Sequence, residues 1–229
     1  MGKSETIKIY SIEGSLEGKV LYIVAPGPSL SGFPIEKLAG KYSIALNSAI
    51  EFFNPTWWMF TDKKIFRRYL GHIKKNPNQS IATIKNYVNG IRRRGFEGDI
   101  YEFEYQCRVL RRVENKDPWW WWDEINFLPG RTTVSCNALS FAQILRPKKI
   151  ILVGIDFFVV GGKYYTDGVR MNPGPRDKKR ALKSGANWMR KGFKKKIWTL
   201  DTYTTSIYLR SYIGDYVKYI TVEEAVNDL

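Results

Sequence analysis

The sequence is poor in histidine and cysteine, the residues on which many metal and catalytic sites depend. Its 229 residues include one histidine, His72, and two cysteines, Cys107 and Cys136. A histidine-based metal site is therefore excluded, and a Ser-His-Asp triad would have to use His72. The cysteines lack metal-ligand spacing, and such low cysteine content fits a reducing compartment. We therefore expect a cytoplasmic protein without a structural metal.

Long apolar runs are also missing. No run reaches the ~18 residues of a membrane-spanning helix, and the first residues lack the apolar core of a signal peptide. Hydrophobic residues make up 44% and charged residues 26% of the chain, which is typical of a folded domain. This length suits one α/β domain, so we expect a single domain over residues 1–229.

Acidic residues are outnumbered, with 22 Asp and Glu against 37 Lys and Arg, for a net charge of +15. The basic residues cluster at 92–94, 108–112 and 176–196. Such an excess favours an anionic partner: nucleic acid, a phosphorylated metabolite or an anionic membrane surface. Solvated helix faces are the alternative explanation for these clusters.

The most informative stretch is an apolar run, residues 20–24, that leads into Pro26-Gly27-Pro28-Ser29. Apolar runs of this length suit a strand buried on both faces, as in a parallel sheet covered by helices. Gly27 lets backbone approach a ligand closely, while the prolines fix φ. Open α/β sheets bind nucleotides at such a turn, at the carboxyl end of a strand. A purely structural turn remains equally compatible with the pattern.

Three later apolar runs also end in polar side chains. Residues 42–46 lead to Asn47, residues 57–61 to Asp62, and residues 148–153 to Gly154-Ile155-Asp156. Helical patterns alternate with these runs, and further elements are expected in the last third of the chain. The expected segments are helices at 63–75, 133–145, 177–191 and 204–212, and strands at 81–84, 99–105, 196–200 and 217–222. This alternation predicts a single Rossmann-like, doubly wound, mostly parallel sheet, with a central insertion at 85–130 and a lid loop at 159–176.

Several short stretches together resemble a known family. They are Val24-Ala-Pro-Gly-Pro-Ser-Leu30, Ala45-Leu-Asn47, Gly130-Arg-Thr-Thr133, and Leu152-Val-Gly-Ile-Asp-Phe-Phe158 followed by Gly161-Gly-Lys-Tyr164. Their order resembles glycosyltransferase family 42, the bacterial lipooligosaccharide sialyltransferases. It also resembles the wider group that contains 6-hydroxymethylpterin diphosphokinase-like proteins and motility accessory factors. The central insertion is not part of the resemblance.

The resemblance implies roles for individual residues. Gly27, Pro28, Ser29 and Asn47 would contact the nucleotide, with Asp156 facing its cytidine or ribose. Arg131, Thr132 and Thr133 would line the sugar and phosphate, and Tyr164 would help the phosphate leave by donating a hydrogen bond to it.

Two departures from the family pattern bear on catalysis. Phe158 stands where the family carries a second tyrosine, and the family's catalytic histidine is absent. In the alignment that the resemblance implies, Asp177 stands at the position of this histidine. We expect Asp177 either to serve as the general base or simply to cap the helix that begins there.

The leading hypothesis is an inverting, metal-independent glycosyltransferase that passes a sugar, such as sialic acid, from a CMP-activated donor to a glycan acceptor. Trp120 and Trp121, in a run of four tryptophans, would stack against the acceptor, or else anchor the protein to a membrane or a second subunit. The implied context is lipopolysaccharide biosynthesis, with a homo-oligomer in contact with the inner face of an anionic membrane.

Two alternatives stay open. A Mg²⁺-dependent diphosphokinase acting on a pterin-like alcohol would use Asp62 and Asp156 as metal ligands. A basic protein that binds nucleic acid or a membrane surface would explain the charge and the interleaved aromatic residues.

Overall fold

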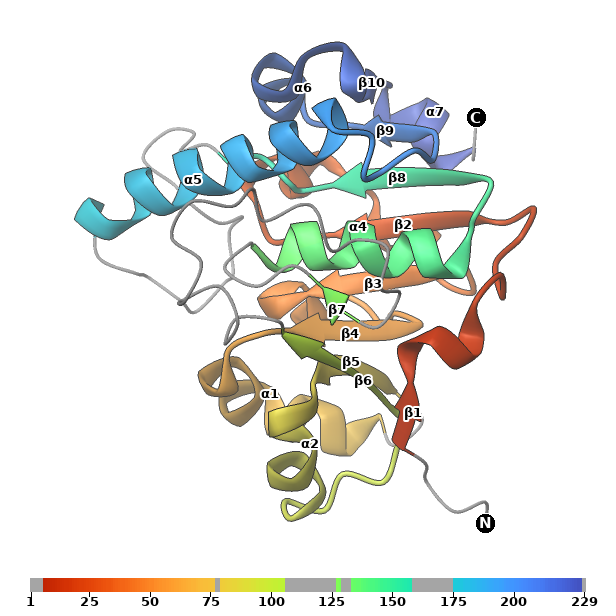
Figure 1. Cartoon of the computed structure of the whole chain (residues 1–229), viewed down its shortest axis with the longest axis vertical. Helices are drawn as coiled ribbons and strands as arrows, with labels where there is room; N and C mark the ends of the chain where they lie inside the picture. The colour runs from red at the N-terminus through yellow and green to blue at the C-terminus, as the bar shows by residue number, and fades with distance from the viewer. Residues whose placement is uncertain (1–5, 77–78, 106–126, 129–132, 158–174, 228–229) are drawn as a thin grey trace.

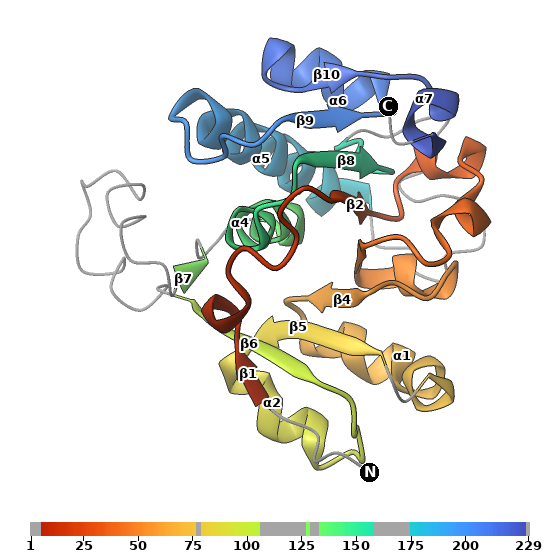
Figure 2. The same cartoon turned by 90° about the vertical axis from the view of Figure 1, so that its right-hand side faces the viewer.

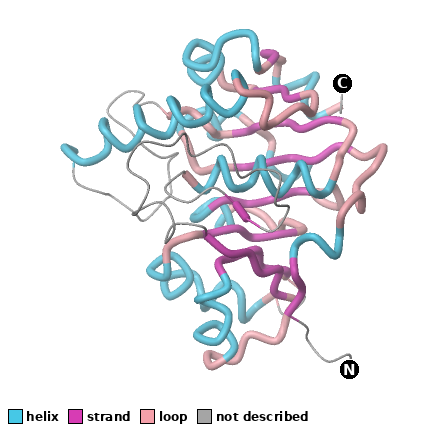
Figure 3. Tube along the Cα trace, viewed as in Figure 1, coloured by secondary structure: helices cyan, strands magenta, loops and turns pink. Residues whose placement is uncertain are grey.

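The structure is a computed structural model that describes residues 6–76, 79–105, 127–128, 133–157 and 175–227. Helices and strands alternate along the chain, with short 3-10 helices between them (Figure 3). The strands are β1 (Thr6–Lys8), β2 (Val20–Val24), β3 (Ser43–Leu46), β4 (Trp57–Phe60), β5 (Ser80–Ile84), β6 (Ile100–Tyr105), β7 (Phe127–Leu128), β8 (Lys149–Val153), β9 (Thr202–Thr204) and β10 (Lys218–Tyr219). The α-helices are α1 (Lys63–Lys75), α2 (Lys85–Arg92), α4 (Val134–Leu145), α5 (Pro175–Lys194), α6 (Ile207–Ile213) and α7 (Val222–Val226). The 3-10 helices are η1 (Ile9–Ile12), η2 (Pro28–Gly32), η3 (Ile35–Leu38), η4 (Asn47–Glu51) and η5 (Gly214–Tyr216).

One parallel sheet organises these elements. Its order is β1-β6-β5-β4-β3-β2-β8-β9-β10, with β7 paired to β6, and every described pair of strands is parallel (Figure 1). The central strand β2 pairs with β3 on one side, where Val24 lies opposite Ala45, and with β8 on the other, where Val24 lies opposite Val153. Because all these strands point the same way, their carboxyl ends share one edge of the sheet.

Helices cover both faces of the sheet, which explains the continuous apolar runs of its central strands. Along β2, Leu21 and Ile23 pack into one core cluster with α4, α5 and α6. Tyr22 and Val24 point to the opposite face, into a second cluster with α1, α2 and α7. Figure 2 shows α4 and α5 on one side of the sheet and α1 on the other. This alternation is the period of two expected for a strand buried on both faces.

The predicted fold class, a doubly wound parallel α/β sheet, is confirmed. Within the region expected as a central insertion, residues 85–105 form α2 and β6 and extend the sheet. The rest of that region and the expected lid loop lie outside the described residues, apart from β7 and the first two residues of α5, so the domain organisation stays a prediction. Among the described residues, no helix is both long and apolar enough to cross a membrane.

One segment prediction is wrong. Residues 196–200 do not form a strand, because Lys196 has a positive φ of 55° and Trp198 turns into the core beside α5. The strand at this place in the sheet is β9, which begins at Thr202. The first strand, β1, lies at the edge of the sheet and pairs with β6 in parallel.

Candidate active site at the carboxyl edge of the sheet

A topological switch point lies between β2 and β8. From β2 the chain proceeds through β3, β4 and β5 in one direction along the sheet, and from β8 it proceeds to β9 and β10 in the other. Loops that follow two such strands diverge to opposite faces, which leaves a crevice at their carboxyl ends where open α/β sheets bind ligands. The turn after β2 carries Ser29 and the turn after β8 carries Asp156, so these two predicted site residues meet at the switch point.

Ser29 and Asp156 are directly bonded. The Ser29 backbone N–H donates to Asp156 Oδ2 at 2.8 Å, and the Ser29 hydroxyl donates to Asp156 Oδ1 at 2.6 Å. A third donor is the hydroxyl of Ser206, which bonds the same Oδ1. Asp156 is 2% exposed, and a buried carboxylate needs partners of this kind to offset its lost hydration. We call these three residues the Asp156 clamp, because together they tie the turns after β2, β8 and β9 to one another.

Two glycines allow the turns to come this close. Gly27 N–H donates to the Gly154 carbonyl at 2.8 Å. A Cβ added at Gly27 would lie 2.3 Å from that carbonyl oxygen, and one added at Gly154 would lie 2.0 Å from the Ala25 oxygen. Gly154 also has a positive φ of 67°, which favours glycine. Any larger residue at either position would force the two turns apart.

Asn47, at the end of the neighbouring strand β3, extends the same edge. Its φ is 50°, a left-handed conformation that asparagine tolerates better than most residues. Its backbone carbonyl accepts a hydrogen bond from Trp58 Nε1 at 2.7 Å, which fixes the turn. Left-handed non-glycine residues cluster at functional sites, and this one follows a strand adjacent to the clamp.

The amino end of α4 contributes a cap and a buried thiol. Thr133 is the N-cap of α4, and its hydroxyl oxygen accepts from the backbone N–H of Cys136. Burial raises the pKa of the Cys136 thiol to about 12, so this cysteine stays protonated and is not a nucleophile. Gly185 of α5 brings its backbone close to Thr133 and Phe157, where a Cβ would lie 2.5 Å from the Thr133 methyl. The first turn of α4 is thereby packed beneath α5.

Asp62 does not join Asp156. It follows β4, which is three strand spacings from β8, or about 14 Å across the sheet. Its carboxylate caps α1 by accepting from the Lys64 backbone N–H at 2.8 Å. Two carboxylates at this separation do not share one Mg²⁺, whose ligands lie about 2.1 Å from the ion. Within the described residues, no group of three or more metal-ligating side chains is found.

Several predicted site residues fall outside the described part of the chain. They are Trp120, Trp121, Arg131, Thr132, Phe158 and Tyr164. Asp177 lies in the first turn of α5, which begins two residues earlier than expected, at Pro175. It is therefore inside the helix rather than at its N-cap position. Gly27, Pro28, Ser29, Asn47, Thr133 and Asp156 all follow strands, or begin a helix, at the carboxyl edge of the sheet.

Ser206 and its neighbour Thr205 were not predicted as site residues from the sequence. Ser206 caps α6 by accepting from the Leu209 N–H while it donates to Asp156. The Thr205 hydroxyl is buried and lacks a hydrogen-bond partner among the described residues. The run Thr204-Thr205-Ser206 after Thr202-Tyr203 was the available signal, and misplacing β9 hid it.

Comparison with known proteins places the fold among those of sialyltransferases. No protein-family model matches the sequence, and no curated protein matches it either. Solved structures share the fold, among them two that were determined with bound ligands. One is the sialyltransferase CstII from Campylobacter jejuni in complex with a substrate analogue, CMP-3FNeuAc, with 17% identity, a TM-score of 0.50 and coverage of 85% of each chain. The other is the sialyltransferase CST-II in complex with trisaccharide acceptor and CMP, with 18% identity, a TM-score of 0.50 and coverage of 86% of this chain and 85% of the other. The chain therefore has a fold like that of these sialyltransferases.

Proposed function

We propose that the protein is a glycosyltransferase that binds a CMP-activated sugar in the crevice between β2 and β8. The observation that carries this proposal is the Asp156 clamp, which joins Ser29 and Ser206 at the switch point of the sheet. The sialyltransferase CstII, whose fold is similar, was solved in complex with a substrate analogue, CMP-3FNeuAc, which supports a CMP-sugar as donor and sialic acid as the sugar.

In this proposal the described residues shape the nucleotide site. The Asp156 clamp holds the glycine turns after β2 and β8 together, so that Gly27, Pro28 and Ser29 present backbone to the nucleotide. Asn47 and the Thr205 hydroxyl add polar groups on either side. The amino end of α4, capped by Thr133, supplies a positive dipole end for the phosphate, where Arg131 and Thr132 would also bind.

The reaction we propose is a direct displacement that inverts the anomeric carbon without a metal ion. Asp177 would take the proton of the acceptor hydroxyl. Arg131 and Tyr164 would stabilise the charge that develops on the departing phosphate, with Phe158 beside the nucleotide. Residues 159–176 would close over the donor and exclude water. Trp120 and Trp121 would stack against the glycan acceptor.

The cellular role that fits this chemistry is lipopolysaccharide biosynthesis on the cytoplasmic side of the membrane. A net charge of +15 would draw the protein to an anionic membrane surface. We also propose that the protein is a homo-oligomer.

A thermal-shift panel of CMP, CDP, UDP, GDP and ATP, each with and without Mg²⁺, tests the donor class. At about one hundred times its dissociation constant, a ligand adds about 2.7 kcal/mol to the free energy of unfolding. We expect CMP to stabilise the protein without metal and ATP to have little effect. Stabilisation by ATP that requires Mg²⁺, with none by CMP, would instead indicate the diphosphokinase.

The role of Asp177 is tested by Asp177→Asn, with the exposed Asp201→Asn as the matched control. Loss of the general base should lower the rate of sugar transfer at least a hundredfold and leave CMP binding unchanged. Transfer at the wild-type rate by Asp177→Asn would remove this residue from the mechanism.

A further inference from the structure

The exposed residues of α1 are cations, apart from one glycine, within the described part of the helix. They lie on one face of the helix because of its period of 3.6 residues. These exposed residues are Lys63, Lys64, Arg67, Arg68, Gly71 and Lys75. The opposite face carries Ile65, Phe66 and Tyr69, which are buried in the core. We call the five exposed lysines and arginines the α1 basic face.

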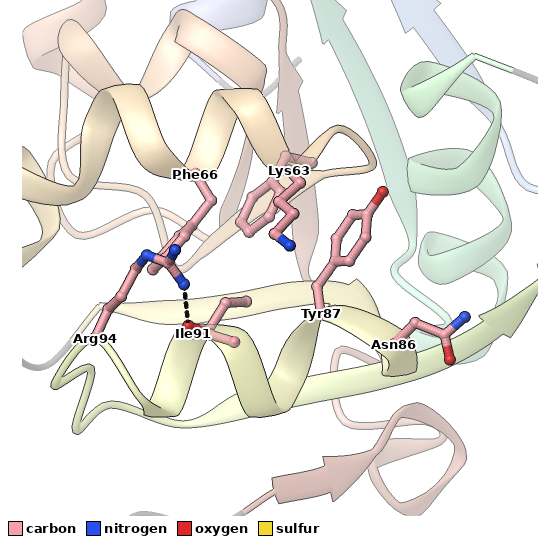
Figure 4. Close-up of a pocket in the computed structure, with 8 residues that line it drawn as sticks. Lys63, Phe66, Asn86, Tyr87, Ile91 and Arg94 are labelled. Atoms are coloured by element: carbon pink, nitrogen blue, oxygen red, sulfur yellow. Dashed lines mark hydrogen bonds between the residues drawn. The ribbon is translucent and has the colours of Figure 1, made fainter.

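No carboxylate of α1 or of its neighbour α2 offsets these charges, because neither helix contains Asp or Glu. Figure 4 shows Lys63 and Arg94 in the space between the two helices, where the Arg94 guanidinium donates to the Gly90 carbonyl at 2.8 Å (dashed line). Asp62, just before α1, caps the helix. Within the described part of the chain, no residue of the α1 basic face forms an ion pair. Its charges are therefore left facing solvent.

The positions of these cations oppose the stability of α1. Lys63 and Lys64 occupy the first turn, at the positive end of the helix dipole, where cations are unfavourable. Arg67 and Arg68 follow them by one turn, so two pairs of like charges lie at i, i+4, an arrangement that destabilises a helix. The basic cluster at the end of α5 differs, because the dipole favours cations in a last turn. The helix dipole thus accounts for the α5 cluster and not for the α1 basic face.

The α1 basic face lies beside the proposed nucleotide crevice. α1 begins just after β4, at the carboxyl edge of the sheet, and β4 is two strand spacings, or about 10 Å, from β2. α5 packs on the opposite face of the sheet (Figure 2). A flat anionic surface against α1 would therefore lie beside the crevice, with the end of α5 on the far side of the sheet.

We propose that the α1 basic face docks on an anionic phospholipid bilayer. A helix with a cationic exposed face is typical of binding to membrane surfaces, and each cation near an anionic bilayer strengthens binding about fivefold. Nucleic acid is disfavoured, because single-strand binding uses exposed aromatic rings, and the exposed aromatic residues in the described part of the chain lie outside α1 and α2. That the bilayer carries the acceptor rests on the proposed transferase function, whereas the docking does not.

The test is sedimentation with vesicles of phosphatidylcholine, either alone or mixed with phosphatidylglycerol. We expect binding to the mixed vesicles only, weakened by added salt because the contact is electrostatic. A variant that combines Lys63→Gln, Lys64→Gln, Arg67→Gln and Arg68→Gln should bind at least a hundredfold more weakly, because four cations at about fivefold each are lost. No binding to the mixed vesicles, or equal binding to both kinds, would overturn the proposal. CMP titration tests the donor proposal separately, since the α1 basic face is not part of the crevice.

A matched variant on α5 separates the α1 basic face from general charge attraction. It combines Arg190→Gln, Lys191→Gln, Lys194→Gln and Lys196→Gln, all at exposed positions, and removes the same number of charges. Its binding to the mixed vesicles should fall by less than about threefold, because these positions lie beyond the screening length from the bilayer. Equal losses in the two variants would overturn the assignment. Tighter binding to a single-stranded oligonucleotide than to vesicles, lost in the α1 variant, would assign this face to nucleic acid instead.

Gly71→Lys adds a cation to the same face. A Cβ at Gly71 would meet nothing within 4 Å, and lysine is a better helix former than glycine, so this variant should fold. It should bind the mixed vesicles about fivefold more tightly, whereas Asn187→Lys, at an exposed position of α5, should change binding little. If the two variants bind alike, α1 is not the contact, and this result does not depend on the fold of the combined variants.

Discussion

Replacing the carboxylate of the Asp156 clamp by an amide should loosen the sheet edge and the nucleotide site together. In Asp156→Asn, if the amide keeps its oxygen toward the hydroxyls of Ser29 and Ser206, its nitrogen faces the Ser29 N–H, donor against donor. If the amide flips, the Ser29 N–H is satisfied and the two hydroxyls must accept instead. Either way, three hydrogen bonds to a charged group become weaker or are lost.

The magnitude follows from the three bonds. A hydrogen bond to a charged group contributes about 1.5–3 kcal/mol and is about twice as strong as a neutral one. If each of the three hydrogen bonds loses half its strength, the free energy of unfolding falls by about 2–4 kcal/mol. Part of this loss is offset, because a neutral amide is easier to bury than a carboxylate. We therefore expect Asp156→Asn to lower the free energy of unfolding by about 2 kcal/mol and to weaken CMP binding.

Urea denaturation followed by circular dichroism measures this loss, and calorimetry measures CMP binding. The matched control is Asp201→Asn, because Asp201 is 60% exposed and pairs only with Lys218 at 3.3 Å among the described residues. Asp201→Asn should change the free energy of unfolding by less than about 0.5 kcal/mol. If Asp156→Asn behaves like this control in both assays, the clamp does not hold the site together.

Three further predictions concern positions away from the clamp's carboxylate. Gly154→Ala should destabilise the protein by about 3 kcal/mol or more, because both its positive φ and the contact with Ala25 oppose a Cβ. Gly18→Ala, which has a similar φ but open space around it, should cost only about 1 kcal/mol in the same denaturation assay. Burial lowers the pKa of His72 below 6.5, so the imidazole takes up a proton at higher pH in the unfolded chain than in the folded one. The wild type should therefore lose more free energy of unfolding than His72→Gln as the pH falls from 7.5 to 5.5. Identical losses would contradict this. Cys136, whose thiol pKa is about 12, should resist alkylation in the native protein at pH 8 and react on unfolding, as peptide mass spectrometry would show.

Much of the sheet was predictable from local sequence. Apolar runs such as residues 20–24 and 148–153 specify buried parallel strands without reference to the rest of the chain. Because parallel strands end at a common edge, the polar residues Ser29 and Asp156 were correctly expected to lie near each other. Their side-by-side placement follows from β2 and β8 being neighbours in the sheet.

The parts of the fold and of the site that were not predicted depend on contacts between residues far apart in the sequence. Gly27 was interpreted as a point of close ligand approach, yet in the structure it meets the turn at Gly154. Residues 196–200 look like a strand locally, but Trp198 is held in the core, where its Nε1 donates to Ser140 at 3.1 Å. A side chain buried by a partner 58 residues away leaves no local signature, and the error concealed Ser206 as well.

The pairing of β2 with β8 also has a consequence for how the protein folds. Val24 and Val153 lie in register at the centre of the sheet although well over a hundred residues of chain separate them. Contacts between residues so far apart in the sequence form slowly, because a long loop must close before any of these contacts is gained. During synthesis, β2 to β5 must therefore wait beside an unoccupied apolar edge until β8 leaves the ribosome, and an unpaired edge of this kind is prone to aggregation.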